Sequence, residues 1–160
     1  MTGIAFTPIG TVRSPHHDPR DMPIQPVGAR GIRGTIELDP TYAAGLRDLE
    51  GFSRIILLYH FHRSEGYALE VVPFLDKTPR GVFATRAPRR PNAVGLSMLK
   101  LIAVDGATLT VEDVDILDGT PVLDIKPYVP AFDAFPEERA GWLTATSGAA
   151  RTMRSDGRFC

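Results

Sequence analysis

Short runs of alternating apolar and polar residues, rather than long helical repeats, fill most of this chain of 160 residues. Such alternation is typical of β-strands that bury one face. The runs predict strands over residues 4–13 (with a break at Pro8), 35–38, 55–62, 68–73, 96–104, 107–114 and 122–125, and a further strand-like run at Val82, Phe83 and Ala84. Asp105 and Gly106 join two of these runs and predict a tight hairpin turn.

Two helices interrupt this pattern. Asp39 is suited to cap a helix that starts at Pro40, because its carboxylate accepts from free backbone N–H groups and proline has none to lose. Apolar residues then follow at helical spacing, at Tyr42, Leu46 and Leu49, and Gly51 ends the segment. Residues 136–146, which include Trp142, predict the second helix.

The order of these elements predicts the fold class. Seven or eight short strands with hairpin turns, and no alternation of strand with helix, favour a mainly β, non-Rossmann fold. Its expected form is an antiparallel β-barrel-like sheet or a sandwich, with two or so short helices. Fourteen prolines and fifteen glycines agree with many turns. The length suits one domain, expected over residues 1–146, with a flexible C-terminal tail over 147–160.

Composition narrows the classes of function. The formal net charge is −1, so an anionic partner must be held by a local patch rather than by an overall positive field. The one cysteine, Cys160, excludes an internal disulfide framework and fits a reducing cytoplasm. The longest apolar run, residues 55–59, is too short to span a membrane, and the N-terminus lacks a secretion signal pattern. We therefore expect a cytoplasmic protein with no membrane contact.

A stiff, arginine-rich loop is the first candidate for chemistry. Residues 81–95 read G-V-F-A-T-R-A-P-R-R-P-N-A-V-G, in which Pro88 and Pro91 restrict the backbone around Arg86, Arg89 and Arg90. Such guanidinium groups bind carboxylates or phosphates at little cost in entropy. The alternative is an ordinary surface loop whose arginines pair with nearby acids.

An acidic stretch is the second candidate. Residues 115–128 read D-I-L-D-G-T-P-V-L-D-I-K-P-Y and offer carboxylates at Asp115, Asp118 and Asp124 and donors at Lys126 and Tyr128. The D-G-T-P portion alone is an ordinary type I turn. A turn leaves the period-two spacing of the other polar residues around it unexplained.

Other classes of site find little support. His60 and His62 share one strand face if the strand reaches residue 62, but a metal site needs a third ligand, and a buried or pocket-lining histidine is an alternative. Residues 14–34 form a long polar segment with Gly28, Gly31 and Gly34, which has no strand before it and no helix after it, unlike a dinucleotide-binding motif. No G-x-S-x-G, H-E-x-x-H or P-loop pattern occurs. We predict no metal site.

Three motifs resemble those of the TsaA-like family, which includes the TrmO tRNA methyltransferases. They are I-G-T-V-R-S-P at residues 9–15 and the two stretches at 81–95 and 115–128, and the resemblance covers residues 6–133. Ala87 stands where the family usually has serine and Ala93 where it has a second proline, and each is expected to loosen the loop. The long C-terminal extension of some bacterial members is missing, together with whatever it contributes to tRNA binding.

The resemblance implies an S-adenosylmethionine-dependent methyltransferase built on a β-barrel and assembled as a homodimer, with the cofactor near the subunit interface. The implied substrate is N6-threonylcarbamoyladenosine at position 37 of the tRNA anticodon loop, which gains a methyl group on N6. The implied cofactor-binding residues are Pro26, Val27, Gly28, His62, Arg63, Arg86, Leu96, Val114, Asp115, Ile116 and Leu117.

Chemical roles can be assigned within this set. Arg86 suits the cofactor carboxylate, and Asp115 or Asp118 suits the ribose diol or the sulfonium. We expect Asp118 or Tyr128 to act as the base and Lys126 to polarise the carbamoyl oxygen, which makes these three the predicted catalytic residues. Arg89 and Arg90 are predicted to hold anticodon-loop phosphates, and Tyr128 is suited to stack on a base. Two alternatives are a methyltransferase acting on another RNA or a small molecule, and a ligand-binding module without catalysis; a histidine-metal hydrolase is a remote third.

Overall fold

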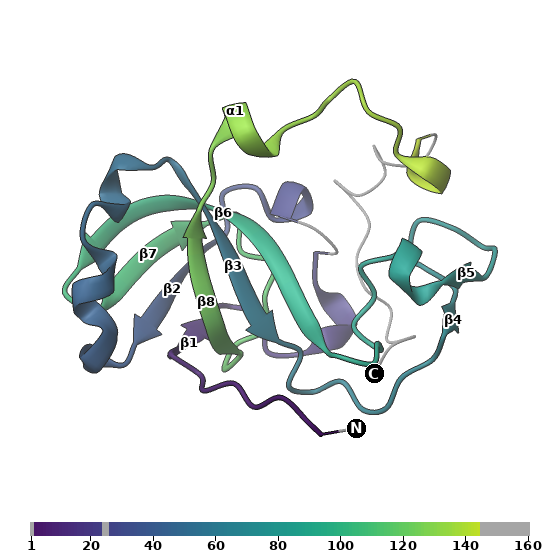
Figure 1. The fold of residues 1–160 in the computed structure, drawn as a ribbon, viewed down its shortest axis with the longest axis horizontal. Helices are drawn as coiled ribbons and strands as arrows, with labels where there is room; N and C mark the ends of the chain where they lie inside the picture. The colour runs from purple at the N-terminus through teal and green to yellow at the C-terminus, as the bar shows by residue number, and fades with distance from the viewer. Residues whose placement is uncertain (1, 24–25, 145–160) are drawn as a thin grey trace.

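The computed structural model describes residues 2–23 and 26–144, and within them a closed antiparallel β-barrel forms the main body (Figure 1). Its strands are β1 (Gly10–Arg13), β2 (Arg33–Leu38), β3 (Arg54–His60), β6 (Val94–Asp105), β7 (Thr108–Glu112) and β8 (Pro121–Pro127). They follow one another around the barrel in the order β1-β2-β7-β6-β3-β8, and every neighbouring pair is antiparallel. The predicted fold class is confirmed in its barrel form, and the predicted hairpin at Asp105 and Gly106 joins β6 to β7.

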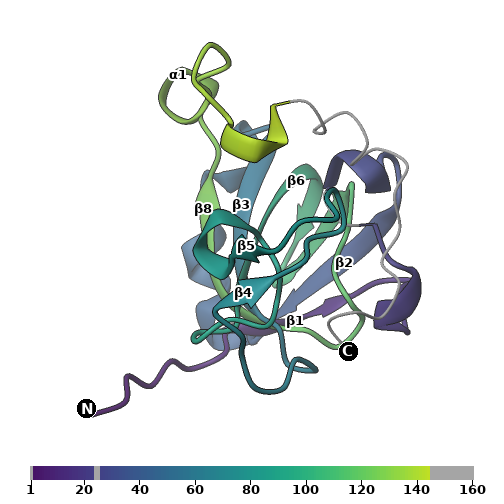
Figure 2. The ribbon, with the colours of Figure 1, turned by 90° about the vertical axis from the view of Figure 1, so that its right-hand side faces the viewer.

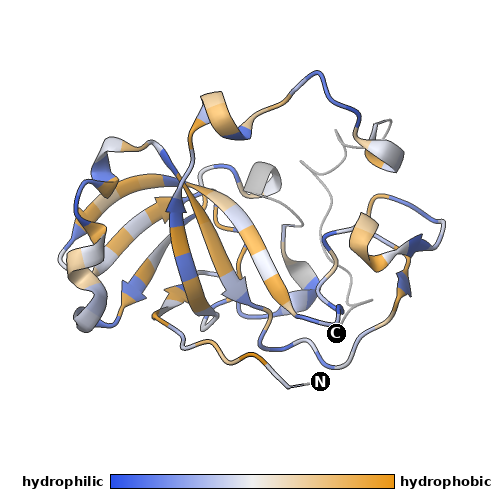
Figure 3. Ribbon diagram, viewed as in Figure 1, coloured by the Kyte–Doolittle hydropathy of each residue, from blue (hydrophilic) through white to orange (hydrophobic). Residues whose placement is uncertain are grey.

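The barrel closes around the inward face of each strand. Along β3, buried Ile55, Leu57 and Tyr59 alternate with partly exposed neighbours, and the other strands add further apolar side chains to one cluster. Figure 3 shows hydrophobic and hydrophilic bands along strands such as β8. The largest fully buried side chains include Val12, Ile36, Ile55, Leu57, Leu99, Leu109, Val111 and Val122. Burial of these residues supplies the main driving force for closure.

Two irregularities change which residues face outward. The register of β3 against β8 shifts between Leu58 and Tyr59, so that Val122 and Ile125 both pack on the core although they are three residues apart. The register of β6 against β7 shifts between Leu101 and Ala103. Sequence alternation alone does not reveal such bulges, because one extra residue inverts the face of everything after it.

A small lobe lies beside the barrel, at the right in Figure 1 and nearest the viewer in Figure 2. Its two-stranded sheet pairs β4 (Glu70–Val71) with β5 (Arg80–Gly81). Val71, Val82 and Ala87 form its own buried cluster, with Ala68 packed against them. This lobe carries the arginine-rich loop between β5 and β6.

The remaining elements are short helices of three to seven residues. They are the 3₁₀ helices η1 (Pro19–Asp21), η2 (Pro26–Ala29), η3 (Pro40–Leu46), η4 (Leu49–Gly51), η5 (Val82–Ala84) and η6 (Gly141–Leu143), and the α-helix α1 (Pro130–Asp133). No helix in the described part of the chain is long and apolar enough to cross a membrane.

Several predicted strands are too long. Residues 4–9 do not join the first strand, and Ile4 and Phe6 are 84% and 72% exposed. The strand predicted over 68–73 shortens to Glu70–Val71, because its partner β5 is only two residues long. The strand predicted over 55–62 ends at His60, so the period-two argument does not extend to His62.

The two predicted helices form only as short 3₁₀ segments. Asp39 does cap a helix, since its carboxylate accepts the Thr41 N–H at 2.9 Å. The helix is 3₁₀, and Asp48, which adopts the left-handed conformation at φ 69°, separates it from the next turn. Val82–Ala84 is a 3₁₀ turn rather than a strand. Of the helix predicted over 136–146, only Gly141–Leu143 is helical among the described residues; residues 145 and 146 and the tail 147–160 lie outside them.

A substitution at Gly95 tests the packing at the lobe end of the barrel. A Cβ atom at this position would lie 2.3 Å from the Tyr59 ring, so the Gly95→Ala variant must displace a buried aromatic side chain. We expect it to lower the free energy of unfolding by about 1–3 kcal/mol, measured by urea denaturation. Gly81→Ala is the matched control, because nothing lies within 4 Å of its Cβ position. Equal stability of the two variants would contradict the packing described.

Candidate functional site

A chain of polar side chains crosses the interior at the lobe end of the barrel. Tyr59 Oη lies 2.9 Å from Ser97 Oγ, and Ser97 Oγ lies 2.7 Å from Asp115 Oδ1. An ionised carboxylate only accepts hydrogen bonds, so Ser97 donates to Asp115 and Tyr59 donates to Ser97. Tyr59 and Ser97 are 5% and 1% exposed. These two hydrogen bonds therefore run from Tyr59 through Ser97 and end on the carboxylate of Asp115.

The environment of Asp115 changes its acidity. Burial raises its pKa from 3.8 to about 7, and the hydrogen bond from Ser97 and the positive charge of Arg86 only partly oppose this shift. Burial also raises the pKa of Tyr59, with the negative charge of Asp115 adding to the shift and Arg86 opposing it. Arg86, which is itself exposed, thus acts on both groups. The arginine-rich loop therefore lies near enough to the acidic stretch, within one chain, for the charge of Arg86 to act on Asp115.

The start of the long polar segment holds the acidic stretch in place. Ser14 Oγ donates to the carbonyl of Ile116 at 2.5 Å, and His16 Nε2 lies 2.8 Å from the carbonyl oxygen of Val114, to which it donates. The Ser14 N–H donates to Asp118 Oδ1 at 3.0 Å, and the Asp118 N–H donates to the carbonyl of His16 at 2.7 Å. Residues 114, 116 and 118 are therefore anchored, and Asp115 takes an intervening position.

The three predicted catalytic residues lie apart within one chain. Asp118 anchors the loop described above, and its Oδ2 lies 3.6 Å from His17 Nδ1. Lys126 pairs with Asp124 at 2.8 Å on the outer side of β8, and Tyr128 follows that strand, with its N–H donating to the carbonyl of Arg54. Asp118 precedes β8, whereas Lys126 lies five residues beyond the start of that strand at Pro121, a distance of about 16 Å. Lys126 and Tyr128 therefore lie at the opposite end of the strand from Asp118. Their catalytic roles stay predictions.

The arginines of the loop differ in their surroundings. Arg90 Nη1 donates to the carbonyls of Thr85 and Ala87 at 3.0 and 2.9 Å, so this side chain braces the loop itself. Arg89 is half-buried, and its Nε has no hydrogen-bond partner within the described residues. Ala87 is 8% exposed and packs in the core of the lobe. Its small side chain therefore fills a buried position, and the loosening expected from this alanine stays a prediction.

The other residues predicted to bind the cofactor occupy four places. Pro26, Val27 and Gly28 belong to η2, which packs against β6. Leu96 is 41% exposed on the outer face of β6, opposite to the face of Ser97.

The remaining predicted positions lie near the end of β3 and along the acidic stretch. His62 follows β3, and desolvation together with the nearby His60 and Arg63 lowers its pKa. Arg63 reaches the carbonyl of His17 at 3.5 Å. The side chains of Val114 and Ile116 are buried in the barrel core and their carbonyls accept from His16 and Ser14, whereas the side chains of Asp115 and Leu117 are partly exposed.

Sequence reasoning missed several residues that build this site. Ser97 is a polar residue between Gly95 and Leu99 on the inward face of an apolar strand, and that interruption was the available signal. The sequence contains no comparable signal for Asp113. This residue has a positive φ of 66°, and its carboxylate accepts from the Gly31 N–H and pairs with Arg54, each at 2.9 Å. It fixes the turn from β7 into the acidic stretch.

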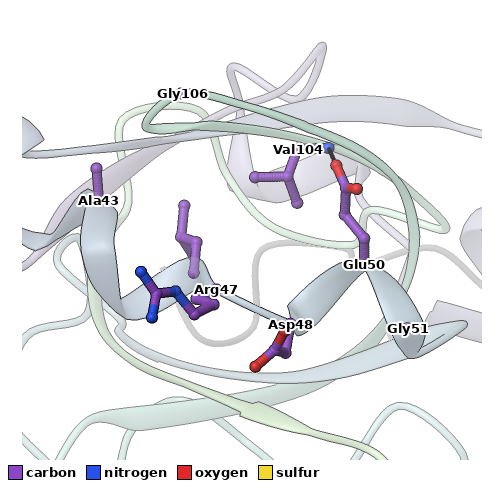
Figure 4. Close-up of a pocket in the computed structure, with 8 residues that line it drawn as sticks. Ala43, Arg47, Asp48, Glu50, Gly51, Val104 and Gly106 are labelled. Carbon is purple, nitrogen blue, oxygen red and sulfur yellow. Dashed lines mark hydrogen bonds between the residues drawn. The ribbon is translucent and has the colours of Figure 1, made fainter.

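A separate depression of about 690 Å³ lies at the other end of β6 (Figure 4). It is lined by Ala43, Leu46, Arg47, Asp48, Glu50, Gly51, Val104 and Gly106. Glu50 accepts the Val104 N–H across its rim at 3.3 Å. None of the predicted site residues lines it. Among the described residues, no three His, Cys, Asp or Glu side chains gather in a way that would hold a metal ion.

Comparison with known proteins agrees with the motifs. Residues 11–134 match the family model described as the tRNA-methyltransferase O N-terminal domain. A probable S-adenosyl-L-methionine-binding protein of Pyrococcus abyssi is 50% identical over 156 residues, which cover 98% of this chain and 85% of the relative. The tRNA (adenine(37)-N6)-methyltransferase of Escherichia coli is 36% identical over 159 residues, covering 93% of this chain and 68% of that protein.

The fold has a close counterpart among solved structures. The crystal structure of TrmO from Pseudomonas aeruginosa superposes with a TM-score of 0.74 at 39% sequence identity. The match covers 88% of this chain and 63% of the Pseudomonas chain, so this chain spans under two thirds of that protein.

The raised pKa of Asp115 predicts a pH-dependent stability. Its folded pKa of about 7 exceeds the ordinary value of 3.8, so the folded state binds more protons than the unfolded state between these values. The free energy of unfolding should therefore fall as the pH rises from about 4 to about 7. In urea denaturation, Asp115→Asn should remove this part of the pH dependence, whereas Asp124→Asn, on the outer face of β8, should keep it. The same pH profile for wild type and Asp115→Asn would contradict the assignment.

Proposed function

Because this chain belongs to the family defined by the tRNA-methyltransferase O N-terminal domain, we propose that it is an S-adenosylmethionine-dependent methyltransferase that acts on N6 of adenine in tRNA. The observation that carries the proposal is that the partly buried Asp115, which accepts a hydrogen bond from Ser97 at the end of the barrel, lies within range of the positive charge of Arg86. The relatives named for S-adenosylmethionine binding and for methylation of adenine 37 support both the cofactor and the acceptor.

The chemistry of these residues fits the cofactor. S-adenosylmethionine supplies a methyl group on a positively charged sulfur, and it carries a carboxylate and a ribose diol. Arg86 presents an exposed guanidinium on a braced loop, which suits the carboxylate. Asp115, a carboxylate within a buried network, suits the sulfonium, because a low-dielectric site strengthens the attraction of opposite charges. Asp118, whose oxygens already face Ser14 and His17, is less available for the same role.

Methyl transfer requires the adenine nitrogen to approach in line, so positioning supplies much of the acceleration. Asp118 or Tyr128 is the proposed base, and Lys126 the group that polarises the acceptor carbonyl. Within one chain these residues lie at the two ends of β8. A homodimer offers a way to join them, since the second protomer can bring its own strand end to the site.

The outer face of β3 and β6 supports the proposed dimer. Val94 and Leu96 are each 41% exposed there, and Leu96 pairs in register with the partly exposed Leu58 of β3. An apolar outer strand face of this kind is suited to a protein interface. It would place the cofactor near the interface, where the outward Leu96 can contribute. The proposed location is the cytoplasm.

The finer proposal concerns the acceptor, which we propose to be N6-threonylcarbamoyladenosine at position 37 of the anticodon loop. The alternative acceptors are another RNA or a small molecule. Purified protein should transfer label from S-adenosylmethionine to tRNA that carries the threonylcarbamoyl group, with the product identified by nucleoside mass spectrometry. Transfer to an unmodified transcript at the same rate would refute the finer proposal and keep the coarser one. No transfer to any tRNA would refute both.

The cofactor proposal predicts a charge-dependent affinity. Ionised Asp115 should attract S-adenosylmethionine more than its demethylated product, which lacks the positive sulfonium. Below the pKa of about 7, the preference for S-adenosylmethionine should fall by up to about tenfold per pH unit. Calorimetry of both ligands across this range should show the change in wild type and a flat ratio in Asp115→Asn. Parallel pH profiles for the two ligands would assign Asp115 to the ribose instead.

A further inference from the structure

The small lobe exposes large apolar side chains that its own core does not use. Tyr67, Leu69 and Phe83 are 60%, 62% and 76% exposed. They come from segments that lie side by side, because the Val82 N–H donates to the carbonyl of Leu69 at 2.9 Å and β4 pairs with β5 immediately beyond. We refer to these three residues as the lobe platform.

The sequence around the lobe platform carries the opposite charge to the rest of the protein. Residues 63–92 contain six arginines or lysines against three acidic residues, a net charge of +3, whereas the rest of the chain has a net charge of −4. A positive segment in a slightly acidic protein favours an anionic partner, although Glu65 and Glu70 are also exposed on it. Lys77 and Arg63 are both exposed on this segment. Aromatic side chains among basic ones are typical of surfaces that bind single-stranded nucleic acid.

The position of the lobe platform links it to the candidate site. Phe83 lies three residues before Arg86, and the Trp142 Nε1–H donates to the carbonyl of Ala84 between them at 2.8 Å. Arg80 stacks on the same Trp142 ring, 5.6 Å from its centroid. These contacts brace the backbone of η5 from one side. The platform is therefore set at a fixed place beside the group that we propose binds the cofactor.

We propose that the lobe platform stacks the bases of an RNA loop next to the one that is methylated. This inference rests on the proposed function, and it deepens it by naming the surface that receives the RNA. An adenine inside a base stack cannot present N6 to a methyl donor, so its neighbours must be unstacked and the loop opened. Phe83 and Tyr67 offer the displaced bases a new surface. Arg90 braces the loop through its Nη1 and is then also a structural residue of the platform.

The test measures binding of an anticodon stem-loop RNA by fluorescence anisotropy at several salt concentrations. Phe83→Ala and Tyr67→Ala should each weaken binding by about 5- to 100-fold, the range expected for loss of one base-stacking contact. The salt dependence should not change, because no phosphate contact is lost. Lys77→Ala should instead reduce the salt dependence. Phe83→Trp, which keeps an aromatic face, should restore binding.

Phe132→Ala is the matched control, since Phe132 is a 72% exposed aromatic residue on α1, outside the lobe. Calorimetry with S-adenosylmethionine should show unchanged affinity in both platform variants. The inference is overturned if Phe83→Ala and Tyr67→Ala bind RNA as tightly as Phe132→Ala, or if they change the oligomeric state in sedimentation, which would make the platform a protein interface. Failure of the wild type to bind or methylate RNA would instead refute the proposed function.

Discussion

The partly buried carboxylate of Asp115 is the constraint on which the rest of the site depends. A carboxylate in this position is costly unless donors and a positive charge surround it. The inward hydroxyl of Ser97 and the loop arginine Arg86 supply them, and each comes from a different part of the chain. The barrel and the lobe must both be in place before this group is satisfied, which ties the site to the complete fold.

The barrel contributes rigidity, and the loops contribute chemistry. Closed antiparallel pairing leaves little freedom at the end of β3 and β6, where the Tyr59 ring packs across Gly95. The loop of Ser14 and His16 is joined to the segment 114–118 by four hydrogen bonds. Sites held by such supporting contacts keep their geometry when a ligand binds, so less binding energy is lost to ordering.

Predictions from the sequence succeeded where the local pattern and the tertiary structure agree. The run of strand-forming residues that predicted β3 is confirmed, and the inward face of that strand is buried at every second residue. The helix predicted from Pro40 failed in type, since Asp48 takes a left-handed conformation that a spacing rule does not contain. Residues 4–9 have a strand-like pattern, but strand pairing begins at Gly10, directly after Ile9, which bonds to Val122 and Asp39 through its backbone. The motifs at 81–95 and 115–128 identified both halves of the site, and they gave no hint of Ser97 or Asp113.

The sequence by itself determined the class of fold, the family and the types of side chain available for chemistry, because these follow from periodicity and from contiguous motifs. Only the tertiary structure decided which of those side chains meet. It places Arg86 where its charge acts on Asp115, and it directs Arg90 to the carbonyls of its own loop. It also separates Asp118 from Lys126 along β8. The reason is physical: a charge acquires its role from the groups packed around it in space, and bulges and loop paths that a linear pattern does not encode set those neighbours.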